Sequence, residues 1–75
     1  MRVIQDERGE FAIVLEEYKN EDGSITRILL PVRNIKMFLR LIKERPKESG
    51  LEKYMDRVEE IIKLGEKYAN MGKKH

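Results

Sequence analysis

Four basic residues in the middle of the chain have the spacing of one helical edge. Arg33, Lys36, Arg40 and Lys43 lie at offsets of 0, 3, 7 and 10 residues. At about 100° per residue they share an arc of roughly 80°, and we call this set the basic stripe. Arginine offers planar, multidentate donors that suit phosphate, so the stripe predicts contact with a polyanion. The alternative is a solvated edge that pairs with acidic residues of the same chain.

The net charge of +2 conceals an uneven distribution along the 75 residues. Residues 1–26 hold three Lys or Arg and seven Asp or Glu, whereas residues 27–45 hold six basic residues and one acidic residue. Residues 46–75 are nearly balanced, with seven and six. Because steering depends on local charge, a polyanion is expected to meet the middle segment.

The residue types needed for catalysis and metal binding are scarce. The chain has no cysteine, and its one histidine is His75 at the end. This composition excludes disulfides, thiolate zinc sites, cysteine nucleophiles and a Ser–His–Asp triad. We therefore predict that the protein is not an enzyme, with no catalytic residue, metal, cofactor or small-molecule substrate.

Turn signals divide the chain into a meander and two helices. Asp6–Gly9 and Asn20–Gly23 are typical of turns between short β-branched segments. Pro31 can start a helix, and Arg45-Pro46 ends it. Ser49 and Glu52 fit a capping box that opens a second helix. We predict one α+β domain over 1–75, an antiparallel three-stranded meander followed by two α-helices, with strands at about 2–5, 10–18 and 24–30, helices at about 32–44 and 50–69, and a tail over 70–75.

The loop at Asn20–Gly23 predicts the register of the hairpin. If Lys19 pairs with Ser24, Glu16 faces Arg27 as an opposite-charge pair, and Arg27 shares a sheet face with Tyr18. Tyrosine beside arginine suits base stacking with phosphate contact, although Tyr18 would also serve simply to cap the hairpin end. The other face predicts the core and carries Phe11, Ile13, Leu15, Thr26, Ile28 and Leu30.

The second helix carries an apolar stripe at spacings of three and four residues, formed by Leu51, Tyr54, Val58, Ile61 and Tyr68. This stripe has two interpretations: it folds back onto the same chain, or it forms a helix–helix seam with a second copy. A two-faced sheet and a two-sided first helix leave more apolar surface than one small core absorbs. We therefore favour a homodimer with these five residues at its interface.

The segments Glu10–Leu15 and Arg27–Pro31 resemble the strands and helix entry of the Pur-alpha, Whirly and positive-cofactor coactivator group. The composition, rich in Glu and Lys and without Cys or Trp, is typical of hyperthermophile proteins and is similar to that of the archaeal ThermoDBP-related proteins. These families bind single-stranded nucleic acid as dimers or assemblies. The resemblance implies contacts by Tyr18, Arg27, Arg2 and Arg8.

The first functional hypothesis is a cytoplasmic module that binds single-stranded DNA or RNA with little sequence preference, through Tyr18, Arg27, Arg33, Lys36, Arg40 and Lys43. The alternative is a protein–protein assembly module that dimerises through its C-terminal helix. A double-stranded DNA regulator is disfavoured, because a proline-broken, lysine-rich segment separates the helices where a short helix–turn–helix turn would lie. No apolar run reaches the length of a membrane-spanning helix, so no membrane partner is predicted.

Overall fold

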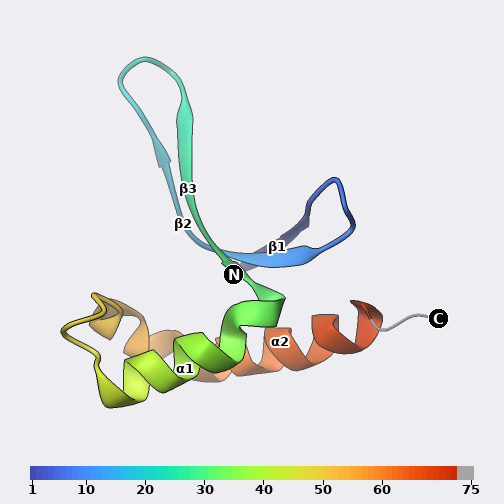
Figure 1. The fold of residues 1–75 in the computed structure, drawn as a ribbon. Coiled ribbons are helices and arrows are strands. Elements are labelled where there is room, and N and C mark those ends of the chain that lie inside the picture. The colour runs from blue at the N-terminus through green and yellow to red at the C-terminus, as the bar shows by residue number, and fades with distance from the viewer. Residues whose placement is uncertain (73–75) are drawn as a thin grey trace.

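The computed structural model describes residues 1–72 and shows a three-stranded antiparallel sheet with two helices packed against one face (Figure 1). The predicted α+β class and order of elements are confirmed. Of the tail predicted over 70–75, residues 70–72 are helical, so that boundary is wrong, and Lys73, Lys74 and His75 lie outside the described residues. The elements are β1 (Arg2–Gln5), β2 (Phe11–Lys19), β3 (Ile25–Pro31), the 3-10 turn η1 (Val32–Asn34), α1 (Ile35–Glu44), the 3-10 segment η2 (Glu52–Arg57) and α2 (Val58–Gly72).

The strands lie in the order β1-β2-β3, so β2 is central and the other two are edges. The main-chain N–H of Asn20 donates to the main-chain carbonyl of Ser24 at 2.8 Å, which makes these two residues the last pair of the hairpin. The turn between β2 and β3 therefore has three residues, Glu21–Gly23. Gly23 is the last residue of this turn and has a φ of +90°, a backbone conformation that residues other than glycine rarely adopt. Each of these two strands begins and ends one residue later than predicted.

A bulge at Leu15 divides the hairpin into two registers. On one side Val14 pairs with Leu29, as predicted. On the other side Glu17, not Glu16, faces Arg27, and the predicted outer register is wrong by one residue. The three-residue loop shifts the pairing of the outer half by one residue from the predicted register. The bulge restores the predicted register in the inner half, because it places two residues of β2 opposite one of β3. Arg57 of η2 donates to the Leu15 carbonyl at 3.3 Å.

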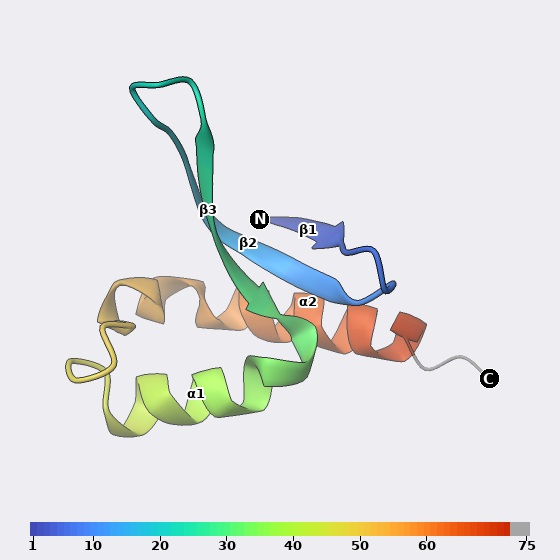
Figure 2. The same ribbon diagram turned by 45° about the horizontal axis from the view of Figure 1, so that its top comes forward.

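The core lies between the sheet and the helices. Its buried residues come from β2, β3, α1, η2 and α2, and they are Ile13, Leu15, Leu30, Ile35, Phe38, Ile42, Tyr54 and Ile61. Ile13 and Ile61 are fully buried. Ile28 and Thr26, predicted as core, are exposed, because the outer half of the β2–β3 hairpin extends beyond the helices in both views (Figures 1 and 2).

The second helical segment begins differently from the prediction. Gly50 has a φ of +76°, which no right-handed helix contains, and residues 52–57 form the 3-10 segment η2 before α2 starts at Val58. The Ser49 hydroxyl donates to the Arg45 carbonyl at 2.7 Å and η2 has no side-chain cap. The predicted capping box is therefore wrong. The Ser49 side chain instead closes the turn that follows α1.

Candidate nucleic-acid interface

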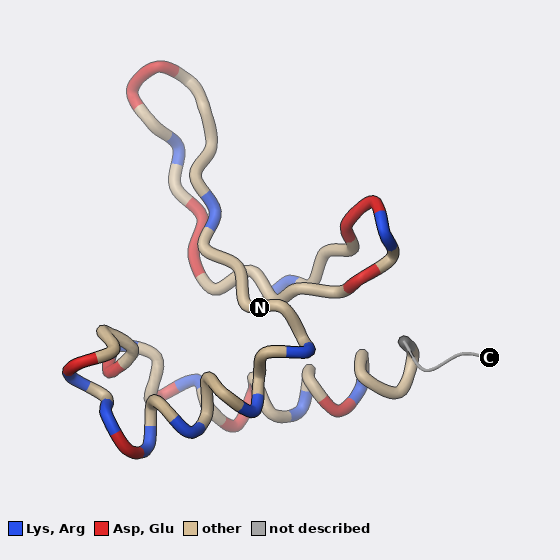
Figure 3. The backbone as a smooth tube through the Cα atoms, in the orientation of Figure 1, with Lys and Arg blue, Asp and Glu red and all other residues tan. Residues whose placement is uncertain are grey.

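The basic stripe lies on the exposed edge of η1 and α1. Ile35, Phe38 and Ile42 turn the opposite side of α1 into the core, so Lys36, Arg40 and Lys43 face solvent. Arg33 forms an ion pair with Glu10. Among the ion pairs of residues 1–72, none involves Lys36, Arg40 or Lys43. Three of the four stripe cations are thus without an acidic partner in the described chain, and Figure 3 shows basic residues following α1.

An open groove of about 800 Å³ adjoins the N-terminal half of this stripe. Its charged lining residues are Arg33 and Lys36 on the α1 side, Arg8 in the β1–β2 turn, Glu10 and Glu66, and most of its surface is apolar. Phe11 of β2 and Tyr68 of α2 also line it, with ring centroids 4.9 Å apart and planes inclined by 50°. The groove therefore combines an aromatic wall with a rim of mixed charge, on which three basic side chains outnumber two carboxylates.

The sequence did not assign these two aromatic residues to the site. Phe11 was expected in the core and Tyr68 in a dimer seam, yet both are only partly buried. Their positions in the sequence could have indicated partial exposure, since Phe11 begins a strand and Tyr68 lies in the last turns of a helix. At such ends a large ring reaches past the packed layers and stays partly open to solvent.

Tyr18 and Arg27 do not form a joint site. Tyr18 pairs with Thr26, and the neighbouring pair is Glu17 with Arg27. Because successive residues of a strand point to opposite faces, Tyr18 and Arg27 lie on opposite sides of the hairpin, and the predicted shared face is wrong. Tyr18 is 47% exposed and stands on the hairpin that extends away from α1 (Figure 1).

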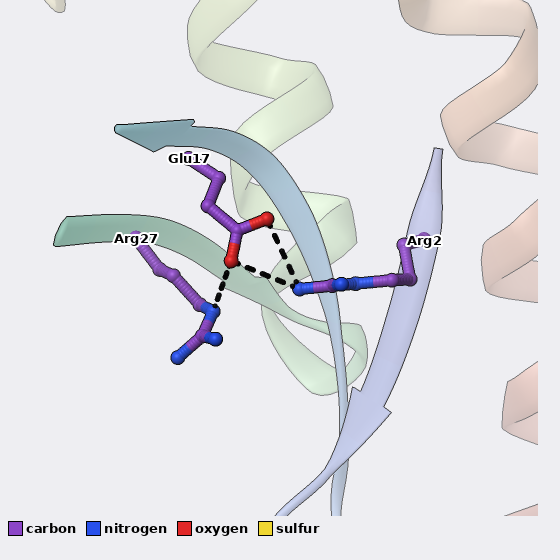
Figure 4. Close-up of polar contacts among 3 residues, drawn as sticks. All are labelled: Arg2, Glu17 and Arg27. Carbon is purple, nitrogen blue, oxygen red and sulfur yellow. Dashed lines mark hydrogen bonds and ion pairs between the residues drawn. The ribbon is translucent and has the colours of Figure 1, made fainter. Parts of the chain in front are cut away.

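Arg27 belongs to a three-residue network on the face of the sheet away from the helices (Figure 4). Its Nε donates to Glu17 Oε2 at 2.7 Å, and Arg2 donates from β1 to both Glu17 oxygens at 3.1 and 3.2 Å. The hydrogen bond from Arg27, together with the charge of Arg2, lowers the pKa of Glu17. One carboxylate therefore joins all three strands, and Arg27 is less available to phosphate than the stripe on α1.

A second acidic residue of β2 fastens η2 to the sheet. Glu16 accepts a hydrogen bond from Lys53 Nζ at 2.8 Å and another from the Tyr54 hydroxyl. These two bonds, that of Lys53 first, lower the pKa of Glu16, while the pKa of Lys53 is raised in turn by Glu16. The cluster positions the segment that leads into α2.

The residues predicted for a dimer seam pack within their own chain. Tyr54 and Ile61 are 4% and 0% exposed, and Leu51 and Val58 pack against the same core. Four of the five stripe residues thus fold back onto their own chain, and the fifth, Tyr68, lines the groove. The large apolar residues that the second helical segment exposes are Met55, Ile62 and Met71.

Neither a metal site nor a membrane-spanning helix is found in the described part of the chain. Residues 1–72 contain no group of three or more His, Cys, Asp or Glu side chains placed to hold a metal ion. Within the same residues, neither helix has the length and apolar character required to cross a bilayer.

Comparisons of this chain with protein-family models, with curated proteins and with solved structures found no match.

Proposed function

We propose that this chain is a small nucleic-acid-binding module that favours single-stranded DNA or RNA and has little sequence preference. The observation that carries the proposal is the row of Lys36, Arg40 and Lys43, which are exposed and have no acidic partner within residues 1–72. An edge that served only to neutralise the acidic N-terminal third would be paired with it. Of the stripe, only Arg33 makes such a pair.

The length of the stripe suits a short run of phosphates. From Arg33 to Lys43 the rise is about 15 Å at 1.5 Å per residue. Each strand of duplex DNA carries a charge about every 3.4 Å of helix axis, so the stripe would face about four phosphates of a strand stacked as in a duplex and fewer of an extended single strand. Lys36, Arg40 and Lys43 would neutralise three of them without first breaking an ion pair.

The groove beside the stripe supports binding of unpaired bases. Phe11 and Tyr68 present ring surface next to Lys36 and Arg33, and aromatic stacking of this kind accepts any base. Tyr18 lies on the separate hairpin and is not needed for this contact. Because stacking and phosphate contacts do not read base edges, the proposed binding has little sequence preference.

The test is a fluorescence anisotropy titration with labelled oligothymidine and with a duplex of the same length. Three phosphate contacts predict a slope of log affinity against log salt of about −2, since single strands give about −0.7 per contact. Affinity should fall roughly 20-fold between 50 and 200 mM salt on that slope. No binding at ~50 mM salt and micromolar protein would refute the proposed function.

Charge-reversal variants locate the interface. Lys36→Glu with Arg40→Glu should reduce affinity and flatten the salt slope, because two contacts become repulsive. The matched control is Lys19→Glu with Lys63→Glu, which makes the same change in net charge at exposed residues away from the stripe. Equal loss in the two double variants would show that binding follows the total charge and not the stripe.

Removal of each tyrosine tests the base contact. Tyr68→Ala should lose affinity for the single strand while Tyr18→Ala retains it, because only Tyr68 lines the groove. The ratio of single-strand to duplex affinity is the readout. A larger loss in Tyr18→Ala would move the stacking site to the hairpin.

A further inference from the structure

Strand β3 is an edge with an unused row of main-chain groups. It pairs with β2 on one side only. The main-chain N–H of Asn20 donates to the main-chain carbonyl of Ser24, so the main-chain groups of these two residues face each other. In an antiparallel ladder this arrangement recurs at every second residue. The main-chain groups of Thr26, Ile28 and Leu30 therefore face β2, and those of Ile25, Arg27 and Leu29 point to the open side.

The side chains along this edge are mostly apolar. Ile25, Ile28 and Leu29 are 47%, 37% and 42% exposed. Arg27 is the one charged residue in β3, and Glu17 of the neighbouring strand already neutralises it. Natural edge strands are usually protected by lysine, by proline or by a covering element, whereas β3 has its single proline at its last residue.

The same strand belongs to the part of the hairpin that no helix covers. The β2–β3 arm extends beyond α1 and α2 in both views (Figures 1 and 2). A two-stranded ribbon is marginally stable in water unless a third strand or another layer packs on it. Within residues 1–72 the arm thus has neither a neighbour for its β3 edge nor a cover for its faces.

We propose that β3 pairs antiparallel with β3 of a second copy about a two-fold axis, joining two three-stranded sheets into one of six strands. A two-fold axis places identical donor and acceptor rows against each other. Axes through Thr26 or Ile28 bring Arg27 opposite Ile25 or Leu29 of the other copy, so the two arginines do not face each other directly. The edges that remain are then the four-residue β1 strands, which are short.

The charge of this edge favours a second copy over an acidic partner. Arg27 shares the Glu17 carboxylate with Arg2, so little positive charge is left to select an acidic peptide. The apolar side chains of Ile25 and Leu29 instead match the same residues of another copy. This dimer also differs from the predicted helix seam, whose residues other than Tyr68 belong to the core or pack against it.

Sedimentation equilibrium on the full chain, from micromolar to millimolar concentration, tests the proposal. The wild type should show twice the 8.9 kDa chain mass. Leu29→Lys and, independently, Ile25→Lys should raise the dimer dissociation constant at least tenfold, because a desolvated lysine opposes pairing. The matched control, Met55→Lys, changes a 52% exposed residue of η2 and should leave the dissociation constant unchanged, and thermal melts establish that each variant is folded.

Amide hydrogen exchange measures the protection of the β3 main-chain amides at the proposed interface. The amides of Ile25, Arg27 and Leu29, which face away from β2, should exchange more slowly at concentrations where the dimer forms. A wild type that stays monomeric at millimolar concentration overturns the proposal. A dimer that Met55→Lys weakens and Leu29→Lys does not would also overturn it, as would assemblies larger than two copies. Amides in β3 that exchange at the same rate at every protein concentration would overturn it as well.

Discussion

The contact between Gly65 of α2 and Ile35 of α1 sets how closely the two helices approach, and a double-mutant cycle can test it. A Cβ added at Gly65 would lie 2.6 Å from Ile35 Cδ1, and 3.7 and 3.8 Å from Cγ2 and Cγ1. The first distance is a clash, and the other two are ordinary contacts. Ile35 is only 8% exposed, and its Cδ1 is the end of a side chain that lines the groove together with Gly65, so it can move aside only by giving up part of its present packing.

Two opposing contributions determine the stability of Gly65→Ala. Overpacking a core costs about 1–3 kcal/mol, while replacing a glycine inside a helix with alanine gains about 1 kcal/mol. The single variant should therefore lose about 0–2 kcal/mol of unfolding free energy. Ile35→Val alone should cost about 0.5–1.5 kcal/mol, and it removes the one atom that clashes.

In the Ile35→Val background the effect of Gly65→Ala should reverse and stabilise the protein by about 1 kcal/mol. The favourable coupling between the two sites is then about 1–3 kcal/mol. For a domain of this size 1 kcal/mol moves Tm by roughly 4–8 °C, so circular dichroism melts of the four proteins resolve the cycle. Gly65→Ala effects of the same sign and size in both backgrounds would refute the contact.

Three other predictions test the fold. Ile61→Ala should lose about 2–5 kcal/mol in urea unfolding because Ile61 is fully buried, and a loss under ~1 kcal/mol would contradict its core position. Gly23→Ala should lose about 1–2 kcal/mol, since alanine is strained at a φ of +90°, and an unchanged Tm would contradict the turn. Glu16→Gln should flatten the acid limb of stability: the lowered pKa of Glu16 stabilises the fold above the ordinary glutamate pKa, and this contribution is lost as the pH falls through the lowered value. The unfolding free energies of wild type and Glu16→Gln are measured by circular dichroism over the acid pH range, and a difference that is the same at every pH would contradict this prediction. Lys53→Met should likewise flatten the acid limb of stability.

The order of elements could be predicted because local chemistry determines it. Glycines mark the two turns, and Pro31 and Pro46 bracket the first helix, so no long-range information is needed. The hairpin register could be predicted only in part, since a bulge at Leu15 leaves no local signal. Its carbonyl finds a donor in Arg57, 42 residues further along the chain, and such a partner is known only once the chain is folded.

The candidate site divides in the same way. The basic stripe follows from the helical period alone, and the structure places its residues on the exposed edge of η1 and α1. The joint site of Tyr18 and Arg27 depended on a register that proved wrong by one residue. The groove beside Tyr68 could not be predicted, because strands, turns and both helices contribute to it, and spacing within one segment cannot show how separate segments meet.

The separation of charge along the fold has a kinetic consequence. Acidic residues gather at the hairpin turns and basic residues along α1 (Figure 3), so the molecule is an electric dipole with a small net charge. In the field of a polyanion such a dipole turns before contact, and encounters occur with the helices leading. This orientation should make the association rate sensitive to ionic strength, with the hairpin arm and its β3 edge turned away during the approach.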